Sequence, residues 1–511
     1  MQARALEVEL ADAPKYKASG PPHGLRIALM LLAAATIVPA SIFLEYTDTN
    51  PSIESFALVT VGSFVILALT AGILYWWRRS EIVAVPVVLA WICLATFGRF
   101  GDRNTTGLQR TVLLLALIAI AAVFIRMFRE KIVTWLLLAS VMSLIATGSQ
   151  LAFAMSTTAS PTEFSASNHG LLKPKGSFYL IVVDGYGPLS GGTSEEAEFL
   201  TKLEDRRVSV VPDAIANYSF TYSSLSNTLS LDHRFKGPTQ RSEIFDTMQG
   251  ANPMRAVFEQ AGWRYVHIES DWTGTRCGPT VTNCVENGWV DDFVWEFFQT
   301  SYFGPQIERS TTHPHVGQGL RSLAALEEHA RETDTGRDFV FAHILLPHPP
   351  LQLNSDCDVL IDERLLGQYY RLLETNAETM ALRQSGYRHQ TACLNARLVS
   401  LLESIDESAS VVITADHGPD LRGQLDKLLA AWDADDLEQR FRIFHAARLR
   451  NGCERSGRHD LVNLIRSEVQ CVTGASLPAI AQHFEISPDF WSDDEARVLT
   501  EEDLSGWLDD H

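Results

Sequence analysis

The sequence predicts an α/β protein with a mostly parallel sheet covered by helices, preceded by an α-helical transmembrane domain of five spans. Two observations carry this prediction. Five long apolar stretches lie within the first 155 residues, and after residue 176 apolar, strand-like runs alternate with helical segments. Such alternation is typical of a parallel sheet with helices on both faces. We therefore divide the chain into a cytoplasmic segment (1–26), a transmembrane domain (27–155), a linker (156–176) and an extracytoplasmic domain (177–511).

The apolar stretches have close to the length needed to cross a bilayer. They cover residues 27–44, 56–77, 82–97, 111–125 and 132–155. A spanning helix takes about 20 apolar residues, with about 17 as the lower limit. The third and fourth stretches are slightly short, so buried helices of a soluble protein are the alternative for those two. Five stretches in a row do not fit a cleavable signal peptide.

Basic residues around these stretches predict the orientation in the membrane. One side holds Arg4, Lys15, Lys17, Arg26, Arg78, Arg79, Arg126, Arg129 and Lys131, and the other side only Arg99, Arg103 and Arg110. The side richer in Lys and Arg is cytoplasmic, so the amino terminus is expected in the cytoplasm and everything after residue 155 outside. The formal net charge of −20 argues against a nucleic-acid partner, because phosphate binding needs a basic surface.

Six of the seven cysteines lie in the part predicted to be exported. An even number of cysteines in an oxidising compartment indicates disulfides. We expect sequence neighbours to pair: Cys277 with Cys284, Cys357 with Cys393, and Cys453 with Cys471. A zinc cluster is the alternative, but the sequence has no C-x-x-C pair.

The exported part begins with a linker rich in Ser, Thr and Ala, followed by the run "SFYLIVVDGYG". A continuous apolar run of this kind is typical of a buried parallel strand. Thr193 followed by Glu196 predicts a capping box and an amphipathic helix. Further helices are predicted over 252–262 and up to about residue 405, with strands over 265–268, 338–346 and 410–415. The acidic residues 491–511 are expected to form a peripheral helix or tail.

Candidate metal ligands follow two of the predicted strands. Asp184 ends "IVVD", and Asp416 and His417 follow "VVITA". Because residues after parallel strands meet at one edge of the sheet, these three side chains can come together there. Two carboxylates and an imidazole suit Zn or Mn better than Ca. The alternatives are a turn-forming Asp-Gly and a helix cap beside a loop histidine.

A candidate nucleophile lies in "NYSFTYSSLSNTLSL", residues 217–231, where Ser and Thr precede apolar residues at helical spacing. A hydroxyl at a helix amino terminus is close to the positive end of the helix dipole and to backbone N–H groups. A bound metal would lower its pKa further. We choose Thr221, and Ser219, Ser223 and Ser224 remain alternatives.

In this order, the motifs resemble those of the alkaline phosphatase and sulfatase superfamily. Within it, "YLIVVDGYG", "NYSFTYSSLSNTLSL", "FVFAHILLPHPP" and "VVITADHGP" resemble the bacterial membrane-anchored group that includes lipoteichoic acid synthase and the phosphoethanolamine transferases. That group also has five spans before its exported catalytic domain. The resemblance covers essentially the whole chain after residue 25. It implies an alkaline phosphatase-like fold and a place in the bacterial cytoplasmic (inner) membrane, with the catalytic domain outside.

The resemblance also assigns roles to single residues. It implies one divalent metal ion, Mn or Zn with Mg possible, held by Asp184, Thr221, Asp416 and His417, with Thr221 also the nucleophile. His348 would contact the phosphate or the leaving group, and His343, Trp272 and Arg276 are further candidates for the substrate site. His343 has packing in the core as its alternative. A second metal would need His459, or His313 and His315.

Two departures from the sulfatase pattern limit the reaction. The sequence lacks the C-x-P-S-R motif and reads "TYSSL" there, and Gly185 follows Asp184 where sulfatases tend to have a second Asp. Sulfate ester hydrolysis by that route is therefore not expected.

The expected function is metal-dependent transfer of a phosphoryl group from a phospholipid to an envelope glycan or lipid through a phospho-threonine. The alternatives are a sulfatase-like phosphoesterase or sulfoesterase that uses water, and an inactive scaffold for envelope-polymer assembly. A transporter is a fourth possibility, but the apolar stretches are poor in charge and lack paired broken helices.

Overall fold

The computed structural model describes residues 23–45, 53–78 and 84–95, single positions up to 149, residues 171–487 with gaps, residues 496–500, and residue 503. The gaps in the long range are 190, 237–240, 271, 287, 289–291, 361–375 and 451–458. The chain divides into two compact units. One comprises residues 1–41 and 58–150, and the other 42–57 and 151–511.

Three apolar helices match the first three predicted stretches: α1 (His23–Glu45), α2 (Ile53–Arg78) and α3 (Ala84–Ala95). They pack through small and branched side chains, including Leu31, Ala34, Leu67, Ala71 and Val88. One helical segment, Ser55–Ile73, is long and apolar enough to cross a membrane, and a shorter apolar one covers Met30–Phe43. The fourth and fifth stretches fall almost entirely outside the described residues, so the five-span domain stays a prediction.

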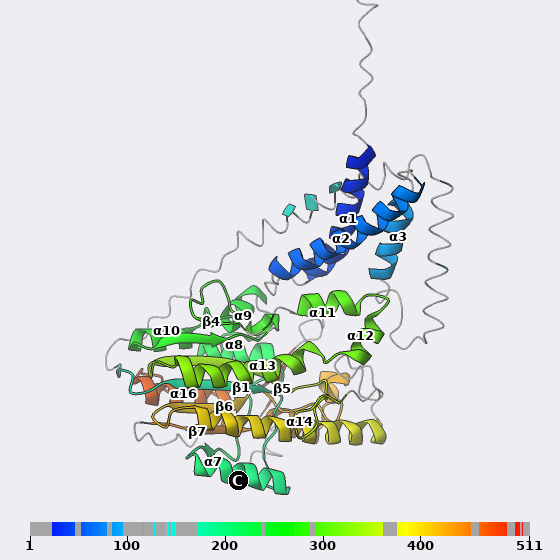
Figure 1. Cartoon of the computed structure of the whole chain (residues 1–511). Coiled ribbons are helices and arrows are strands. Elements are labelled where there is room, and N and C mark those ends of the chain that lie inside the picture. Colours follow the sequence, from blue (N-terminus) through cyan, green and yellow to red (C-terminus); the bar gives the residue numbers. More distant parts are fainter. Residues whose placement is uncertain are drawn as a thin grey trace, which may run out of the picture. The chain divides into compact units, whose positions relative to one another are not determined.

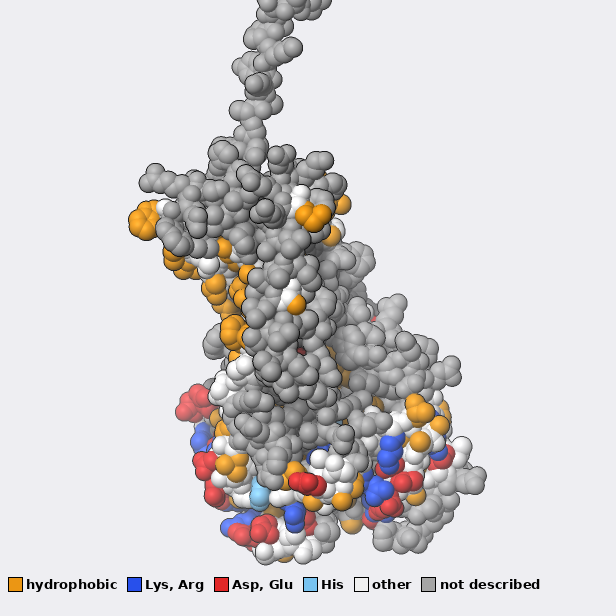
Figure 2. Space-filling model, turned by 90° about the vertical axis from the view of Figure 1, so that its right-hand side faces the viewer, with side chains coloured by type: hydrophobic (Ala, Val, Ile, Leu, Met, Phe, Trp, Pro, Cys, Tyr) orange, Lys and Arg blue, Asp and Glu red, His pale blue; other side chains and the backbone are white. Residues whose placement is uncertain are grey.

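The exposed large side chains of α2 are apolar. They are Leu58, Val61, Val65, Ile66, Leu69, Ile73 and Trp76, and Figure 2 shows apolar side chains on the described part of these helices. On the α/β unit, by contrast, acidic and basic side chains are interspersed (Figure 2). A helix that stays apolar on its exposed side suits a lipid environment better than water.

The α/β unit contains a seven-stranded sheet with the strand order β2-β7-β6-β1-β5-β3-β4. Its strands are β1 (Phe178–Asp184), β2 (Ser209–Val210), β3 (Arg264–Ile268), β4 (Cys284–Val285), β5 (Asp338–Pro347), β6 (Ser410–Ala415) and β7 (His445–Arg448). The strands β6, β1, β5, β3 and β4 pair in parallel, whereas β7 pairs antiparallel with both of its neighbours, β6 and β2. A small second sheet joins β8 (Glu485–Ile486) to β9 (Arg497–Val498). The predicted mostly parallel sheet is confirmed.

The central strands are buried along their whole length. Every residue of β1, β5 and β6 is buried, and these strands are rich in β-branched and aromatic residues. Side chains on both faces of these strands therefore meet apolar neighbours. This is why the runs are continuously apolar and do not alternate with polar residues. The core includes a stacked pair, Phe258 on Phe339, with ring centroids 4.2 Å apart.

Helices cover the sheet on both sides. They are α7 (Ser194–Asp205), α8 (Thr221–Ser230), α9 (Arg241–Met248), α10 (Pro253–Ala261), α11 (Asp292–Gln299), α12 (Gly304–Ser310), α13 (Pro314–Glu328), α14 (Ala377–Ser404), α15 (Ala434–Phe441) and α16 (Leu461–Thr473). In Figure 1, α8 and α10 lie above the strands and α7 and α14 below them. The helices α8, α10 and α16 contact one another, and α14 contacts both α7 and α13.

Local signals explain where several helices begin and end. The hydroxyl of Thr193 accepts a hydrogen bond from the Glu196 backbone N–H (3.2 Å), which is the N-cap half of the predicted capping box. Asn252 caps α10 in the same way through the Arg255 N–H (2.8 Å). Gly262 ends α10 with a φ of +97°, a left-handed conformation that favours glycine.

Two predicted disulfides are present, Cys277–Cys284 and Cys357–Cys393. Cys471 is also disulfide-bonded, and its predicted partner, Cys453, lies outside the described residues. Of the predicted acidic tail, the structure describes only residues 496–500 and 503.

Candidate metal site at the carboxyl edge of the sheet

The three predicted ligands come together at one edge of the sheet. Asp184 is the last residue of β1, and Asp416 and His417 directly follow β6. The two strands are parallel neighbours with Val183 opposite Ala415, so both chains leave the sheet at the same level. One ligand atom from each of the three side chains lies within 4.8 Å of the others, and all three residues are buried.

Asp184 and Asp416 are buried carboxylates that face a single imidazole nitrogen. Oδ1 of Asp184 lies 3.6 Å from Nε2 of His417, and Oδ2 of Asp416 lies 3.3 Å from the same atom. Neither of these two oxygens has a hydrogen-bond partner among the described residues. Burial raises the pKa of Asp184 to about 7, although the charges of Arg440 and His315 act against it. Burial and the neighbouring Asp184 raise the pKa of Asp416 to about 7.

This donor set fits a divalent cation. A buried carboxylate oxygen without a partner is costly, and its charge is costlier still. A metal ion bound between the two carboxylates and the imidazole would neutralise both charges and complete their contacts.

Backbone hydrogen bonds fix the orientation of Asp416 and His417. The second oxygen of Asp416, Oδ1, accepts from the backbone N–H groups of Gly185 (3.1 Å) and His417 (2.9 Å). Nδ1 of His417 lies 3.0 Å from the carbonyl oxygen of Gly418. A carbonyl only accepts, so Nδ1 carries the hydrogen and Nε2 presents its lone pair to the carboxylates. Burial and the charge of Arg440 hold the pKa of His417 well below its usual range, which keeps the ring neutral.

Thr221, the predicted nucleophile, is the first residue of α8 and reaches this cluster. Its Oγ1 lies 3.0 Å from Nε2 of His417. The residue is mostly buried, and its N-cap, Phe220, makes no side-chain capping hydrogen bond. Thr221 therefore combines nearness to the candidate ligands with the positive end of a helix dipole.

The rival hydroxyls are engaged elsewhere. Ser219 accepts from the Ser487 N–H (3.0 Å) and donates to the Ser487 carbonyl (3.3 Å). Ser224 donates to the backbone carbonyl of Asp416 (2.6 Å). The geometry thus separates Thr221 from Ser219 and Ser224, and Ser223 lies half-buried in the same helix.

The helix α8 has low intrinsic propensity, since Ser, Thr and Asn fill most of it. Tertiary contacts compensate, because most of its side chains are buried. Asn227 fastens the helix by accepting from the Phe235 N–H (2.8 Å) and donating to the Phe235 carbonyl (3.2 Å). Leu231 then ends the helix in a left-handed conformation with φ +54°.

His343 of β5 lies behind Asp184. It is completely buried, with Nε2 3.8 Å from Oδ2 of Asp184 and Nδ1 3.0 Å from the hydroxyl of Thr275. Its ring also meets Trp272 edge to face, with centroids 5.5 Å apart. Burial lowers its pKa to about 3. His343 is therefore a packed histidine that also faces the candidate ligand cluster.

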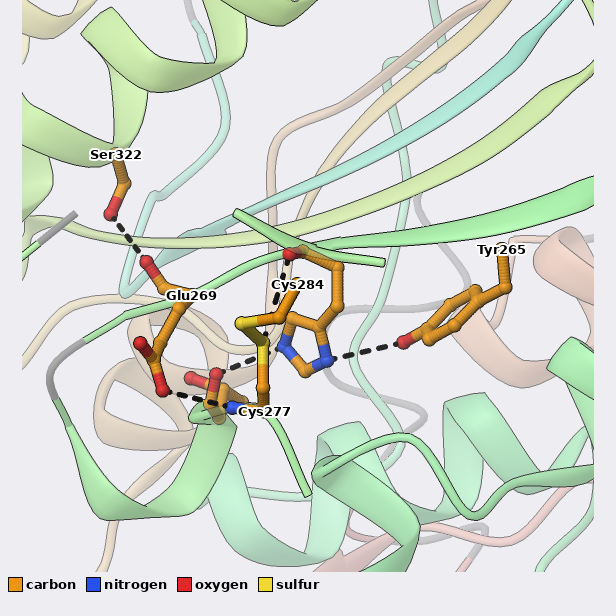
Figure 3. The surroundings of a disulfide bond; sticks show 7 residues. Tyr265, Glu269, Cys277, Cys284 and Ser322 are labelled. Atoms are coloured by element: carbon orange, nitrogen blue, oxygen red, sulfur yellow. Dashed lines mark hydrogen bonds between the residues drawn. A yellow bond between two sulfur atoms is a disulfide. The ribbon is translucent and has the colours of Figure 1, made fainter. Parts of the chain in front are cut away.

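The loop that carries Trp272, Thr275 and Arg276 is fastened by the Cys277–Cys284 disulfide (Figure 3). The backbone N–H of Cys277 donates to Glu269 Oε1 (3.1 Å). Nε2 of His267 bonds to the carbonyl oxygen of Thr275 (3.0 Å). Glu269, Cys277 and Cys284 form a second group with metal-ligand geometry, but the disulfide removes both thiolates.

The two substrate candidates on this loop differ in how the structure places them. Trp272 packs between His343 and Tyr222 of α8, with its ring centroid 5.3 Å from that of Tyr222. Arg276 is half-buried after the short helix Thr273–Thr275. Contact of either residue with a head group stays a prediction.

His348 follows β5 and is half-buried near the candidate ligands. Its Nδ1 donates to the Pro349 carbonyl (2.6 Å), so Nε2 carries the lone pair. Burial and the nearby His315 lower its pKa to about 4, whereas the charge of Asp416 acts in the opposite direction. A neutral imidazole that carries its hydrogen on Nδ1 is better suited to accept a proton at Nε2 than to donate one there.

The candidates for a second metal do not join the ligand cluster among the described residues. His315 pairs with Asp292 (2.8 Å), and its backbone N–H donates to Nδ1 of His313 (3.2 Å) at the start of α13. The side chain of His459 is exposed. A second metal therefore stays a prediction without a described ligand set.

Sequence reasoning missed two residues that shape the site. Arg440 of α15 is 4% exposed and lies 3.3 Å from Nε2 of His417 through Nη2. The hydroxyl of Tyr387 donates to the Gly185 carbonyl (3.2 Å) and accepts from the Gly187 N–H (2.9 Å). Both contacts join residues distant in sequence, so neither leaves a local pattern.

A cavity of about 680 Å³ lies on the α14 side of these loops. Its walls come from the loop after β1, the loop after β6, and helices α7, α14 and α15. It adjoins the metal-ligand loops at Tyr186 and Pro419. Crevices at the carboxyl ends of parallel strands are the usual place for ligands in open α/β sheets.

Comparison with known proteins identifies similar structures but no close sequence relative. No protein-family model matches the chain, and no curated protein matches its sequence. One similar structure is the C-terminal periplasmic domain of EcEptC from Escherichia coli. It has 12% identity and a TM-score of 0.41, and the match covers 67% of this chain and 96% of that one. That domain is also known in complex with Zn.

Two further structures come from related groups. The integral membrane lipooligosaccharide phosphoethanolamine transferase EptA from Neisseria meningitidis has 12% identity and a TM-score of 0.40. That match covers 89% of this chain and 97% of EptA. A 2-O GAG sulfatase has 10% identity and a TM-score of 0.40, with 65% and 86% covered. The similar structures thus include a phosphoethanolamine transferase and a sulfatase.

Proposed function

We propose that this protein is a membrane-anchored phosphotransferase with an extracytoplasmic catalytic domain. It would move a phosphoryl-containing head group from a phospholipid to a hydroxyl of an envelope glycan or lipid. The observation that carries the proposal is the meeting of Thr221 with Asp184, Asp416 and His417 at one edge of the sheet. The apolar helices α1 and α2 support access to a lipid donor.

The proposed metal ligands are Asp184, Thr221, Asp416 and His417. Bound there, a divalent ion would lower the pKa of the Thr221 hydroxyl and offset negative charge on the phosphoryl oxygens. The unpartnered oxygens of the two aspartates support Zn or Mn, with Mg possible.

In the first step, Oγ1 of Thr221 attacks the phosphorus of the donor diester. The Thr221 hydroxyl loses its proton to solvent as a bond forms between Oγ1 and phosphorus. The bond from phosphorus to the lipid oxygen breaks, and the lipid alcohol leaves after taking a proton from solvent. The positive end of the α8 dipole favours the charge that develops beside Thr221. His417 stays neutral and oriented because Nδ1 donates to the Gly418 carbonyl.

In the second step, the acceptor hydroxyl attacks the phosphorus on Thr221 and restores the threonine. His348 is the proposed base, because its Nδ1 donates to the Pro349 carbonyl and leaves the lone pair on Nε2, and its lowered pKa keeps the ring neutral. Water in place of the acceptor would give hydrolysis, so the same site accounts for the phosphoesterase alternative.

The test is release of diacylglycerol from a mixed bacterial phospholipid extract by the detergent-purified full chain with Zn or Mn. We expect the wild type to release diacylglycerol and Thr221→Ala to lose that activity. Ser223→Ala is the matched control, because its hydroxyl is two residues along the same helix. Equal release by the wild type and Thr221→Ala, or none by the wild type under any of these metals, contradicts the proposal.

A further inference from the structure

Arg440 joins the two segments that carry the proposed nucleophile and metal ligands. Its Nε donates to the Ser219 carbonyl (2.6 Å), and Nη1 donates to the Gly418 carbonyl (2.8 Å). Its guanidinium carbon lies 5.4 Å from the centre of the Phe220 ring, a cation–π contact. These contacts hold the guanidinium in one place between the residues before Thr221 and the residues after Asp416.

The remaining end of the guanidinium points at the candidate site. Nη2 lies 3.3 Å from Nε2 of His417, and Oγ1 of Thr221 lies 3.0 Å from the same nitrogen. The guanidinium N–H and the proposed nucleophile therefore approach one atom. A phosphoryl group bonded to Oγ1 of Thr221 would therefore lie within reach of Nη2.

The charge of Arg440 reaches the whole site. Nε2 of His417, which Nη2 approaches at 3.3 Å, lies 3.6 Å from Oδ1 of Asp184 and 3.3 Å from Oδ2 of Asp416, so the guanidinium is close to all three residues. Arginine stays charged at any physiological pH, and its planar group matches phosphate oxygens. At 4% exposure the guanidinium is shielded from bulk water, which strengthens its interaction with an anion in the site.

Phosphoryl-transfer sites with two metals hold the transferred group between two cations. Among the described residues, the cluster around His417 provides one group of metal ligands at this edge of the sheet. A fixed guanidinium beside that group is a second positive charge that needs no second metal.

We propose that Arg440 is a phosphoryl-binding residue: its Nη2 donates to a non-bridging oxygen of the phosphoryl group at Thr221 and supplies the second positive charge of the transfer site. This inference rests on the proposed function for the identity of the transferred group. It requires no new covalent step, because Arg440 only binds the group while the bonds to Thr221 form and break.

The direct test is binding of inorganic phosphate to the Zn-loaded full chain, measured by calorimetry. A lost charge-assisted hydrogen bond predicts binding weakened on the order of 100-fold in Arg440→Ala. The phosphate affinity of Arg440→Lys should lie between those of the wild type and Arg440→Ala, because lysine keeps the charge but lacks the planar guanidinium group. Added guanidinium ion should restore part of the affinity of Arg440→Ala. The Zn content of each variant is measured in the same samples.

Arg442→Ala is the matched control. Arg442 lies two residues further along and pairs with Asp213 (3.5 Å) and Glu438 (3.3 Å), so its loss should leave phosphate affinity unchanged. Unchanged phosphate affinity in both Arg440 variants overturns the inference. A loss of phosphate affinity that occurs only together with a loss of bound Zn also overturns the inference. Arg440 would then affect only the metal ligands and would not bind the phosphoryl group.

The same samples separate this inference from the proposed function. Bis(4-nitrophenyl) phosphate serves as a diester probe, and formation of an adduct on Thr221 is followed by intact mass. Weak phosphate binding by Arg440→Ala supports the role of Arg440 even where the wild type forms no adduct. Absence of an adduct on the wild type would count only against transfer through Thr221.

Discussion

The surroundings of Asp184 and Asp416 favour the ionised carboxylates only when a cation is bound between them. Each lies at a strand end that is fully buried, and each has one oxygen without a described hydrogen bond. Without a metal, burial and mutual repulsion oppose ionisation of both carboxyls. Asp184 and Asp416 therefore reduce the stability of the metal-free fold, and the same two carboxyls form the candidate metal site.

Asp416→Asn tests this account of the ligands. The amide oxygen can still accept from the Gly185 and His417 N–H groups, so the fold should be retained. Because one of two buried like charges is gone, we expect the metal-free variant to unfold at the same temperature as the wild type or a higher one. Zn should raise the unfolding temperature of the wild type and leave that of the variant unchanged.

The control for that change is Asp435→Asn, which alters a 71% exposed carboxylate on α15. It should bind Zn as the wild type does. Retention of Zn by Asp416→Asn contradicts its role as a ligand. Unfolding of the variant without metal would instead make Asp416 a structural residue.

The sequence was sufficient to predict the site residues that directly follow strands. It was insufficient for the site residues that reach the same place from a helix elsewhere in the chain. Asp184, Asp416 and His417 were found because the carboxyl ends of parallel strands share an edge. Arg440 lies in "LEQRFRIF", a segment whose pattern is typical of a short amphipathic helix. Its contacts with Ser219 are 221 positions away in sequence, and no local pattern encodes them.

At the scale of elements, the end of α15 and the loop after β6 are in very close contact. A Cβ at Gly418 would overlap the backbone oxygen of Gln439 and lie 2.9 Å from that of Arg442. The Gly418 N–H also donates to the Arg440 carbonyl (2.7 Å). This approach places both Arg440 and His417, so the glycine is needed for the site as well as for the fold.

Gly418→Ala should therefore reduce Zn affinity and stability together. Backbone atoms cannot move aside as a side chain can, so either the loop or α15 must shift. We expect a loss of about 2 kcal/mol or more in the free energy of unfolding. Gly317→Ala is the matched control, since its Cβ would meet only the end of the Arg321 side chain. A Gly418→Ala variant with wild-type Zn affinity and stability would contradict this account.

The elements predicted best were the long buried strands and capped helices. The apolar runs of β1, β5 and β6 are fully buried, and the caps at Thr193 and Asn252 begin helices as expected. The short strands β2, β4 and β7 were not predicted, because two to four residues carry too little periodicity. Pairing with a neighbouring strand, not the local sequence, creates these elements.

At the scale of the whole molecule, a buried aspartate links the strands to the segment after α13. Asp338, the first residue of β5, accepts from Arg264 of β3 (2.9 and 2.7 Å) and from the Thr335 N–H (3.3 Å), and lies 3.3 Å from His329. Burial raises the pKa of Asp338, but hydrogen bonds from His329, Arg264 and Thr335 outweigh it. The pKa is therefore held well below its usual range.

A lowered pKa in the folded state makes stability depend on pH in a defined direction. The contribution of Asp338 is complete above the unfolded pKa of about 3.9 and is lost as the pH falls through the lower folded pKa. We expect Asp338→Asn to lower the unfolding temperature by a few degrees at pH 7. The difference from the wild type should shrink below about pH 4.

Thermal unfolding of the full chain in detergent, between pH 3 and pH 7, measures this difference. Glu403→Gln is the control, because Glu403 forms an exposed pair with Arg206 that should contribute little. A difference between Asp338→Asn and the wild type that stays constant down to pH 3 would show that the carboxyl charge is not the cause.

The apolar amino-terminal part is the feature on which the proposed access to a lipid donor rests. The described helices α1 to α3 pack on one another, and α2 keeps apolar side chains on its exposed surface. The sequence predicts five spans from length and charge. The disulfides Cys277–Cys284 and Cys357–Cys393 agree with the export that this topology implies.

The central claim is that Thr221 carries the transferred group, and intact mass measurement tests it most directly. The full chain is incubated with Mn and a mixed bacterial phospholipid extract, beside Thr221→Ala and Ser219→Ala. We expect an adduct on the wild type and on Ser219→Ala, mapped by peptide analysis to Thr221, with none on Thr221→Ala. The mass of the adduct would identify the head group. An adduct that persists in Thr221→Ala, or maps to another residue, would contradict the account.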